Sequence, residues 1–196
     1  ISDALRERIS SASLSWGSLG LNTAVKPSHR DPNRLRIGET VYDRGLGVHA
    51  DSEVAVDLAG EYLVFEAEVG VQWQGGQTAG SVVFQVFVDD RKQFDSGVMK
   101  ENDPPRSVRV SVKDADELRL VVDNAGDGIT SDVADWVNAR LTRNPEVQGR
   151  RERAAVNVAV FARVVASDPR RIEGTKADRK HEFPAEDLAL TEELPP

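Results

Sequence analysis

A tryptophan flanked by glutamines stands in a glycine-rich segment, and these residue types together suit sugar recognition. The segment reads Gln72-Trp73-Gln74-Gly75-Gly76. Protein sugar sites pair an aromatic face, which packs on the C–H groups of the ring, with amide or carboxylate side chains that bond the hydroxyls. Trp73 and Gln74 offer both kinds of contact, so we predict a carbohydrate site here. The alternative is a Trp73 ring that folds back onto the protein.

His49 is a second candidate for contact with a sugar. It follows Gly45 and Gly47 and precedes a predicted strand. Its imidazole can donate or accept hydrogen bonds with hydroxyls. The competing interpretation is a buried histidine whose ring bonds loop backbone groups. The two glycines indicate a turn or a close backbone approach rather than phosphate binding, because no helix start follows them.

Several aspartates crowd one segment near the end of the strand-rich region. Oxygen ligands at short spacing are what Ca²⁺ requires, so we predict a structural Ca²⁺ held by Asp127, Asp132 and Asp135. The spacing is not that of an EF-hand, since the glutamate at the twelfth loop position is missing. An ordinary acidic turn is the alternative. Asp127 is also a candidate sugar ligand.

No catalytic set stands out in the sequence. With 33 Asp and Glu residues almost any two carboxylates could be nominated, so acidity alone predicts no catalytic pair. The three histidines, His29, His49 and His181, lie neither in a nucleophile-elbow motif nor at a metal-binding spacing. The chain has no cysteine, which excludes thiol chemistry and a disulfide framework. We therefore expect a protein that is not an enzyme.

Charge and hydropathy restrict the partners of this 196-residue chain. Its formal net charge of −8 opposes nucleic-acid binding, which depends on clustered Lys and Arg. The longest apolar stretch, residues 154–162, is broken by Asn157 and is shorter than the roughly 20 residues of a membrane helix. We expect a neutral ligand, no nucleic acid and no membrane insertion. Because the sequence starts at Ile1 without a signal-like segment, we interpret it as part of a larger protein.

Apolar and polar residues alternate along much of the chain, and this period of two marks half-buried strands. The alternating segments, each a predicted strand, are residues 54–58, 63–71, 82–88, 108–112 and 118–122. Asp89-Asp90 suits a hairpin turn, with residues 91–95 as the returning strand.

Short strands about ten residues apart, separated by Gly, Asp and Pro, predict an all-β fold: an antiparallel β-sandwich or jelly roll. An α+β fold is the alternative. We place the sandwich at residues 11–143. Residues 1–10 are predicted to be a lead-in, in which residues 2–9 form a short helix with Leu5 and Ile9 on one face or stay disordered.

The composition changes after Asn144-Pro145, where a charged stretch at residues 150–153 resembles a linker. We assign residues 144–196 to this linker and a C-terminal extension. Alternating apolar residues at 155–165 predict a strand. That strand either covers an edge of the sandwich as an arm or opens a neighbouring domain.

Sequence blocks in a particular order carry a family resemblance. After an opening Leu14-Ser15-Trp16, the first block is residues 42–53, with Gly45-Leu46-Gly47-Val48-His49-Ala50. The second joins residues 65–71 to 80–86 and 95–98, and the third joins residues 118–123 to Gly126-Asp127-Gly128 and Ala134-Asp135-Trp136. Over residues 11–142 this order resembles the NPCBM family of carbohydrate-binding modules.

The resemblance implies a galactose-binding-like β-sandwich of the kind attached to bacterial glycosidases and surface proteins. It also implies a carbohydrate partner, with galactose-containing glycans bound by some members, neighbouring domains in a larger chain, and an extracytoplasmic location. Family sequences commonly carry aspartates where this chain has Gln72-Trp73, and a histidine where it has Val133. These departures keep a second hypothesis open: a structural or protein-interaction sandwich that has lost sugar binding.

Overall fold

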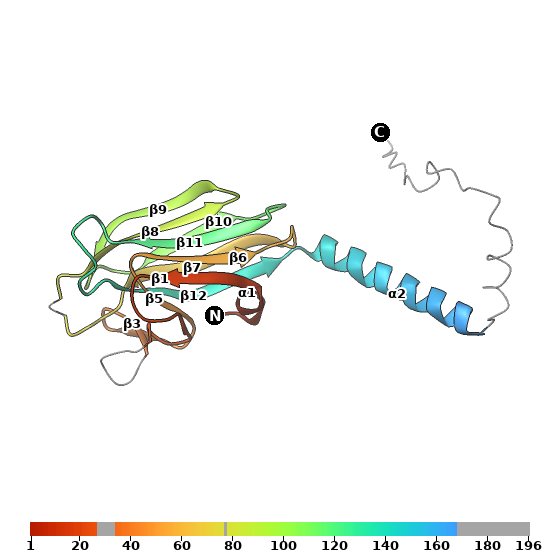
Figure 1. Cartoon of the computed structure of the whole chain (residues 1–196), viewed down its shortest axis with the longest axis horizontal. Helices are drawn as coiled ribbons and strands as arrows, with labels where there is room; N and C mark the ends of the chain where they lie inside the picture. Colours follow the sequence, from red (N-terminus) through yellow and green to blue (C-terminus); the bar gives the residue numbers. More distant parts are fainter. Residues whose placement is uncertain (27–33, 77, 168–196) are drawn as a thin grey trace. The chain divides into compact units, whose positions relative to one another are not determined.

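The computed structural model describes residues 1–26, 34–76 and 78–167, and the chain divides into two compact units, Ile1–Gln148 and Gly149–Pro196. His29, His181 and residues 168–196 lie outside the described residues. The first unit contains two five-stranded sheets and a short hairpin (Figure 1). All the strand pairs in these sheets are antiparallel. The predicted all-β antiparallel sandwich is therefore confirmed.

Neighbouring strands in each large sheet come from distant parts of the sequence. The first sheet has the order β1 (Ile9–Leu14), β6 (Ser52–Asp57), β11 (Glu117–Asp123), β8 (Ser81–Val88) and β9 (Arg91–Lys100). The second sheet has the order β10 (Arg106–Ser111), β7 (Tyr62–Val71), β12 (Val133–Arg143), β5 (Gly45–His49) and β2 (Gly20–Leu21). The hairpin joins β3 (Leu35–Ile37) to β4 (Thr40–Tyr42).

Alternation along the strands builds the core between the two large sheets. On β11, Leu118, Leu120 and Val122 are buried, and the residues between them are only partly buried. Leu120 stands opposite Val86 of β8, and Val122 stands opposite Phe84, so apolar side chains of neighbouring strands share the inner face. This is the parity that the period of two predicted.

The turn predicted at Asp89-Asp90 is also confirmed. Val88 pairs with Arg91 across a two-residue loop, and both aspartates have positive φ, 45° and 63°. Two-residue hairpin loops favour this conformation because its twist matches that of the strands.

Trp136 on β12 occupies the centre of the core. Its side chain is fully buried, and its ring meets Phe84 edge-on with 5.2 Å between centroids. The ring of Phe65, on the neighbouring strand β7 of the same sheet, lies 6.4 Å from it at an interplanar angle of 59°, whereas Phe84 belongs to β8 of the first sheet. Aromatic rings from both sheets therefore meet at this residue, as expected for a core aromatic.

The short helix predicted within residues 2–9 is confirmed, but these residues pack on the sandwich. Helix α1 (Asp3–Arg8) is capped by the Ser2 side chain, and Ile1 and Leu5 are buried in the sandwich core. Ile9 belongs to β1 rather than to the helix. Burial of two apolar side chains explains why these residues are ordered against the sandwich rather than preceding it.

The strand predicted at residues 155–165 is wrong, because helix α2 spans Pro145–Ser167. Asn144 caps its start by accepting a hydrogen bond from the Glu146 backbone N–H at 3.1 Å. Most residues of this segment are apolar, so the alternation that predicted a strand is weak. Its alanines favour a helix. Within the described residues, no helix is long and apolar enough to cross a membrane.

We expect Trp136→Ala to lower the free energy of unfolding by about 3–5 kcal/mol, because it leaves a cavity between the sheets. Chemical denaturation followed by circular dichroism measures this. Val98→Ala is the matched control, since Val98 is 50% exposed, and it should cost less than about 0.5 kcal/mol. Equal losses for the two variants would show that the core lies elsewhere.

Candidate functional site

Three strand ends of the second sheet bring the candidate residues to one end of the sandwich. His49 ends β5, Val133 begins β12 between its neighbours, and Val71 ends β7. His49 pairs with Val133, and the Gln72 N–H donates to the Val133 carbonyl at 2.9 Å. Because adjacent strands lie about 4.8 Å apart, the backbones of His49 and Gln72 are roughly 10 Å apart. The loops around β3 lie at this end (Figure 1).

Trp73 is half-buried, and one face of its indole is covered by a cation. The guanidinium carbon of Arg36 lies 3.8 Å from the ring centroid, which is stacking distance. The backbone N–H of Trp73 also donates to the Arg36 carbonyl at 2.7 Å. The side chain thus neither projects freely into solvent nor enters the sandwich core.

Arg36 reaches Trp73 because the β3–β4 hairpin packs on the outer face of the second sheet. There Asp135 stands between Gly47 on one side and Gly70 on the other. A Cβ on Gly70 would lie 2.6 Å from the Ile37 side chain, and one on Gly47 would overlap the backbone of Ala24. The glycines leave room for the covering segments, and the close approach predicted for Gly47 is confirmed.

Polar side chains beneath the hairpin hold it in register. The backbone N–H of Arg36 donates to Gln72 Oε1 at 3.0 Å and to Asp135 Oδ2 at 3.3 Å. Gln72 Nε2 donates to the Arg34 carbonyl at 3.2 Å. Burial raises the pKa of Asp135 well above its usual range, although the bond from Arg36 acts in the opposite direction.

A buried carboxylate, Glu101, anchors the loop that follows Trp73. Its Oε1 accepts hydrogen bonds from the backbone N–H groups of Gln74 and Gly76, the latter at 2.9 Å. Its Oε2 accepts from the Thr78 N–H at 2.9 Å and from the Thr78 hydroxyl. Burial acts to raise the pKa of Glu101, but these four donors outweigh it and leave the pKa below its usual value.

Gln74 connects this loop to the aspartate-rich loop before β12. Its Nε2 donates to the Ser131 carbonyl at 2.7 Å. Next to Ser131, Asp132 accepts a bond from the Ser81 N–H at 2.9 Å, while the Ser81 hydroxyl donates to Asp127 at 2.8 Å. Trp73, Gln74 and Asp127 therefore belong to two loops that are hydrogen-bonded to each other.

His49 is 7% exposed and makes contacts inside the protein. Its Nδ1 lies 2.6 Å from the Ala50 carbonyl and 3.3 Å from the Ser15 hydroxyl. The Trp16 ring, half-buried, packs against it with 5.4 Å between centroids. The structure thus matches the interpretation of a buried histidine bonded to loop backbone, and the role of His49 as a sugar ligand stays a prediction.

The three predicted calcium ligands do not converge. Asp127 and Asp132 share Ser81, whereas Asp135 lies under the β3–β4 hairpin. Among the described residues no group of three His, Cys, Asp or Glu side chains is placed to hold a metal ion. Burial raises the pKa of Asp132 to about 6, opposed by the Ser81 N–H and assisted by the carboxylates of Asp127 and Asp51.

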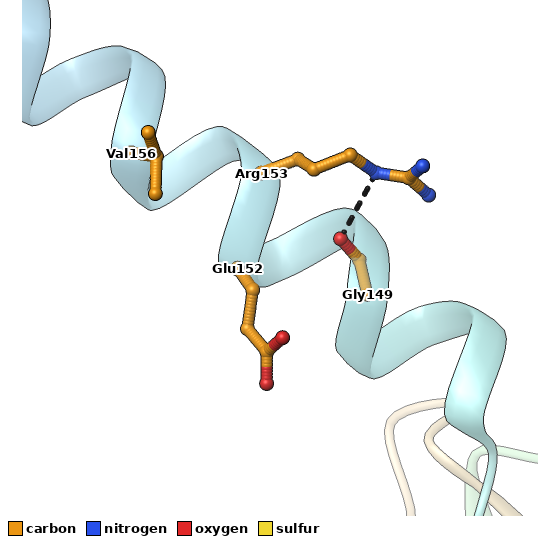
Figure 2. Close-up of a pocket in the computed structure, with 4 residues that line it drawn as sticks. All are labelled: Gly149, Glu152, Arg153 and Val156. Atoms are coloured by element: carbon orange, nitrogen blue, oxygen red, sulfur yellow. Dashed lines mark hydrogen bonds between the residues drawn. The ribbon is translucent and has the colours of Figure 1, made fainter.

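A pocket in the described part of the chain lies on helix α2, away from these residues in sequence. Figure 2 shows its lining residues, Gly149, Glu152, Arg153 and Val156, all from that one helix. Arg153 Nε donates to the Gly149 carbonyl at 3.1 Å, and the Val156 side chain is 60% exposed. No predicted site residue lines it, so it gives no support to a sugar site there.

Two residues of the candidate site were missed by the sequence analysis, Arg36 and Glu101. Neither lies near Trp73 in the chain, and no motif marks them. Arg36 reaches the Trp73 loop from the β3–β4 hairpin, and Glu101 reaches it from the turn after β9.

Comparison with known proteins identifies relatives of the sandwich. The model of the NPCBM/NEW2 domain matches residues 3–142. A Renibacterium salmoninarum protein named "Putative endo-alpha-N-acetylgalactosaminidase" is 27% identical over 134 residues, which cover 68% of this chain but 9% of that protein. The chain therefore spans a small part of this curated relative.

Two solved structures from Clostridium perfringens have similar folds. One is the CBM51 module of GH95 in complex with methyl-galactose, with 35% identity, a TM-score of 0.62, and coverage of 68% of this chain and 94% of that one. The other is CBM51-2 with the INT domains of ZmpB in complex with GlcNAc, with 31% identity and the same TM-score, covering 69% of this chain and 30% of that one.

We expect Glu101→Gln to lower the free energy of unfolding by about 1–3 kcal/mol, because an amide group cannot accept all four hydrogen bonds. Thermal unfolding measures the loss, with Glu39→Gln, on an exposed residue, as the matched control. Since the folded pKa of Glu101 is lowered, the carboxylate stabilises the protein above an ordinary carboxyl pKa of about 4.3. The difference from wild type should shrink as the pH falls through that range. A difference that grows on acidification would contradict this role.

Proposed function

Because the chain belongs to the NPCBM/NEW2 domain family, we propose that it is a non-catalytic carbohydrate-binding module that holds sugar against Trp73. The observation that carries the proposal is the half-buried Trp73 indole, stacked with Arg36 and followed in the same loop by Gln74, at the loop end of the sandwich. An aromatic face with hydrogen-bonding amides nearby is the usual composition of a sugar site. Loops at strand ends can also vary while the sheets keep their positions.

The loop is held in place before a ligand arrives. Glu101 binds the loop after Trp73, and Arg36 covers one face of the ring. A site that is already ordered avoids part of the entropy cost of binding. We assign the solvent-exposed part of the half-buried Trp73 indole to the sugar.

Galactose and N-acetylglucosamine are the first ligands to test, because the similar C. perfringens modules were solved with methyl-galactose and GlcNAc. Each sugar hydroxyl bond replaces a bond to water, so its net gain is only about 1 kcal/mol. We expect dissociation constants from millimolar to tens of micromolar, equivalent to about 4 to 7 kcal/mol.

We propose that the module acts within a larger extracytoplasmic bacterial protein and brings it to glycans. One similar structure contains two such modules together with a catalytic domain of ZmpB. The curated relative is much longer than this chain and bears the name of a glycosidase. Catalysis, where present, would then reside in another part of the protein.

We propose that Ca²⁺ binds at a site formed by two of the three predicted ligands, Asp127 and Asp132. Asp127 and Asp132 converge on Ser81, and Asp132 Oδ2 is buried without a hydrogen-bond partner among the described residues. Such an oxygen suits a cation, although Ca²⁺ requires six to eight oxygen ligands and would need backbone carbonyls or water as well. Asp135 is not a ligand of this site, because its carboxylate accepts a hydrogen bond from the Arg36 backbone N–H of the β3–β4 hairpin.

We expect Trp73→Ala to weaken binding of methyl galactoside or N-acetylglucosamine at least fivefold without unfolding the module, because the ring packing is lost. Isothermal titration calorimetry measures the affinity, and circular dichroism the fold. Trp16→Ala is the matched control, since Trp16 is also a half-buried tryptophan of a loop. Loss of binding in Trp16→Ala with retention in Trp73→Ala would move the site to the Trp16–His49 pair.

We expect saturating Ca²⁺, at about a hundred times its dissociation constant, to add about 2.7 kcal/mol to the free energy of unfolding. Differential scanning calorimetry with Ca²⁺ and with a chelator measures the change. Asp132→Asn should abolish the effect, and Asp103→Asn, on a different loop, should preserve it. An unchanged melting temperature after exhaustive chelation would contradict the cation site.

A further inference from the structure

Strand β1 forms an exposed edge of the first sheet. It pairs with β6 on one side, and within the described residues no strand lies on its other side. Residues 10–13 of the strand are exposed to solvent. Such an edge presents unpaired backbone N–H and C=O groups, to which another strand can bond.

The register of β1 determines which of its backbone groups face away from β6. The Ser15 N–H donates to the Asp51 carbonyl at 2.8 Å, which continues the ladder between β1 and β6. Backbone groups of successive residues in an antiparallel strand face opposite sides, so those of Ser13 also bond β6. The N–H and C=O groups of Ala12 and Leu14 therefore point outward.

A bulge shortens the part of β1 that can accept another strand. The register with β6 shifts between Ile9 and Ser11, and from there the pairing is regular to Leu14. Bulges and short length both limit the pairing of an edge. This edge therefore supports only a short ladder, over residues 11–14.

β1 lacks the charges that protect the longer edge strands of the two large sheets. Its sequence, Ile-Ser-Ser-Ala-Ser-Leu, contains no charged residue. The edge strand β9 contains Arg91, Lys92 and Lys100, and the edge strand β10 contains Arg106 and Arg109. Charged side chains on an edge oppose pairing with another sheet. A new strand thus meets less opposition at β1 than at β9 or β10.

We propose that β1 pairs with β1 of a second copy of this chain, in an antiparallel register centred on Ser13. Ala12 of each copy then lies opposite Leu14 of the other, and each of these pairs exchanges two backbone hydrogen bonds. Every outward backbone group of the regular segment is bonded in this register. Ser13 lies opposite its own copy, where the two side chains are close enough to interact.

The side chains of β1 suit pairing with an identical strand. Leu14 packs against the core and Ala12 has the same parity, so their pairs extend the inner face of the sheet. On the outer face, Ser13 pairs with Glu53 of β6, which is bonded to Arg119 at 3.2 Å. In the dimer Glu53 lies three strand spacings, roughly 14 Å, from its copy. This exceeds the screening length of about 8 Å at physiological ionic strength, so repulsion is weak.

The short ladder implies a weak dimer. It buries less than the roughly 1,600 Å² of a standard interface. We expect a dissociation constant of the dimer from about 10 μM to 1 mM. A dimer carries two copies of the proposed sugar site, and two sites raise the avidity for a glycan that displays repeated sugars.

Sedimentation velocity of the full chain tests the proposal. Wild type should change from monomer to dimer as its concentration rises through about 10 μM to 1 mM. Ala12→Pro should weaken dimerisation at least tenfold and keep the fold, because it removes an outward N–H that the pairing with β6 does not use. Monomer at every concentration, or a dimer that Ala12→Pro leaves unchanged, would overturn the proposal.

Charges placed at the centre of the register test the geometry. Ser13→Lys and Ser13→Glu should each stay monomeric, because like charges then lie directly opposite, and an equimolar mixture should form a mixed dimer. Ser107→Lys, on an exposed serine of the edge strand β10, is the matched control and should dimerise as wild type does. A mixture that stays monomeric, or an equal loss in Ser107→Lys, contradicts the assigned edge.

Circular dichroism checks the fold of each variant. If Ala12→Pro fails to fold, the Ser13 variants and their mixture decide the outcome. Self-association is measured without sugar, so a failure of sugar binding leaves this inference standing, and a monomeric wild type leaves the sugar-binding proposal standing.

Discussion

The buried carboxylate of Glu101 is the constraint on which the candidate site depends. A glycine-rich loop has few apolar side chains to hold it, so its order must come from hydrogen bonds. Glu101 supplies acceptors for three backbone N–H groups and one hydroxyl, and those donors in turn make a buried charge tolerable. The loop and the carboxylate therefore stabilise each other. As a result, the loop that carries Trp73 and Gln74 has an ordered backbone, and Gln74 also bonds the Ser131 carbonyl.

A second constraint acts from the outer face of the second sheet. Gly47, Asp135 and Gly70 form a row across three strands. Gly70 leaves room for Ile37 of the β3–β4 hairpin, Gly47 leaves room for the backbone of Ala24, and Asp135 accepts a hydrogen bond from the hairpin. Gln72 bonds the same hairpin through both its amide oxygen and its amide nitrogen. Gln72 therefore has a structural role, because the hairpin that it holds carries Arg36, whose guanidinium lies over Trp73.

The sandwich was predictable because each strand repeats a period of two that burial imposes locally, as on β8 and β11. The turn at Asp89-Asp90 was predictable for the same local reason. Helix α2 was not, since a short apolar segment with few polar residues, such as 155–165, is compatible with both strand and helix periods. In the site, Trp73 and Gln74 could be nominated from their own segment. Arg36 and Glu101 could not, because their relation to Trp73 exists only once the hairpin and β9 are in place.

The central claim is that sugar packs against Trp73, and the three indole N–H signals in a ¹H–¹⁵N correlation spectrum test it most directly. Single Trp→Phe variants assign the signals of Trp16, Trp73 and Trp136. On titration with methyl galactoside or N-acetylglucosamine, we predict a saturable shift of the Trp73 signal, with the buried Trp136 signal unmoved. Saturable shifts confined to Trp16, or no shift at tens of millimolar sugar, would contradict the account.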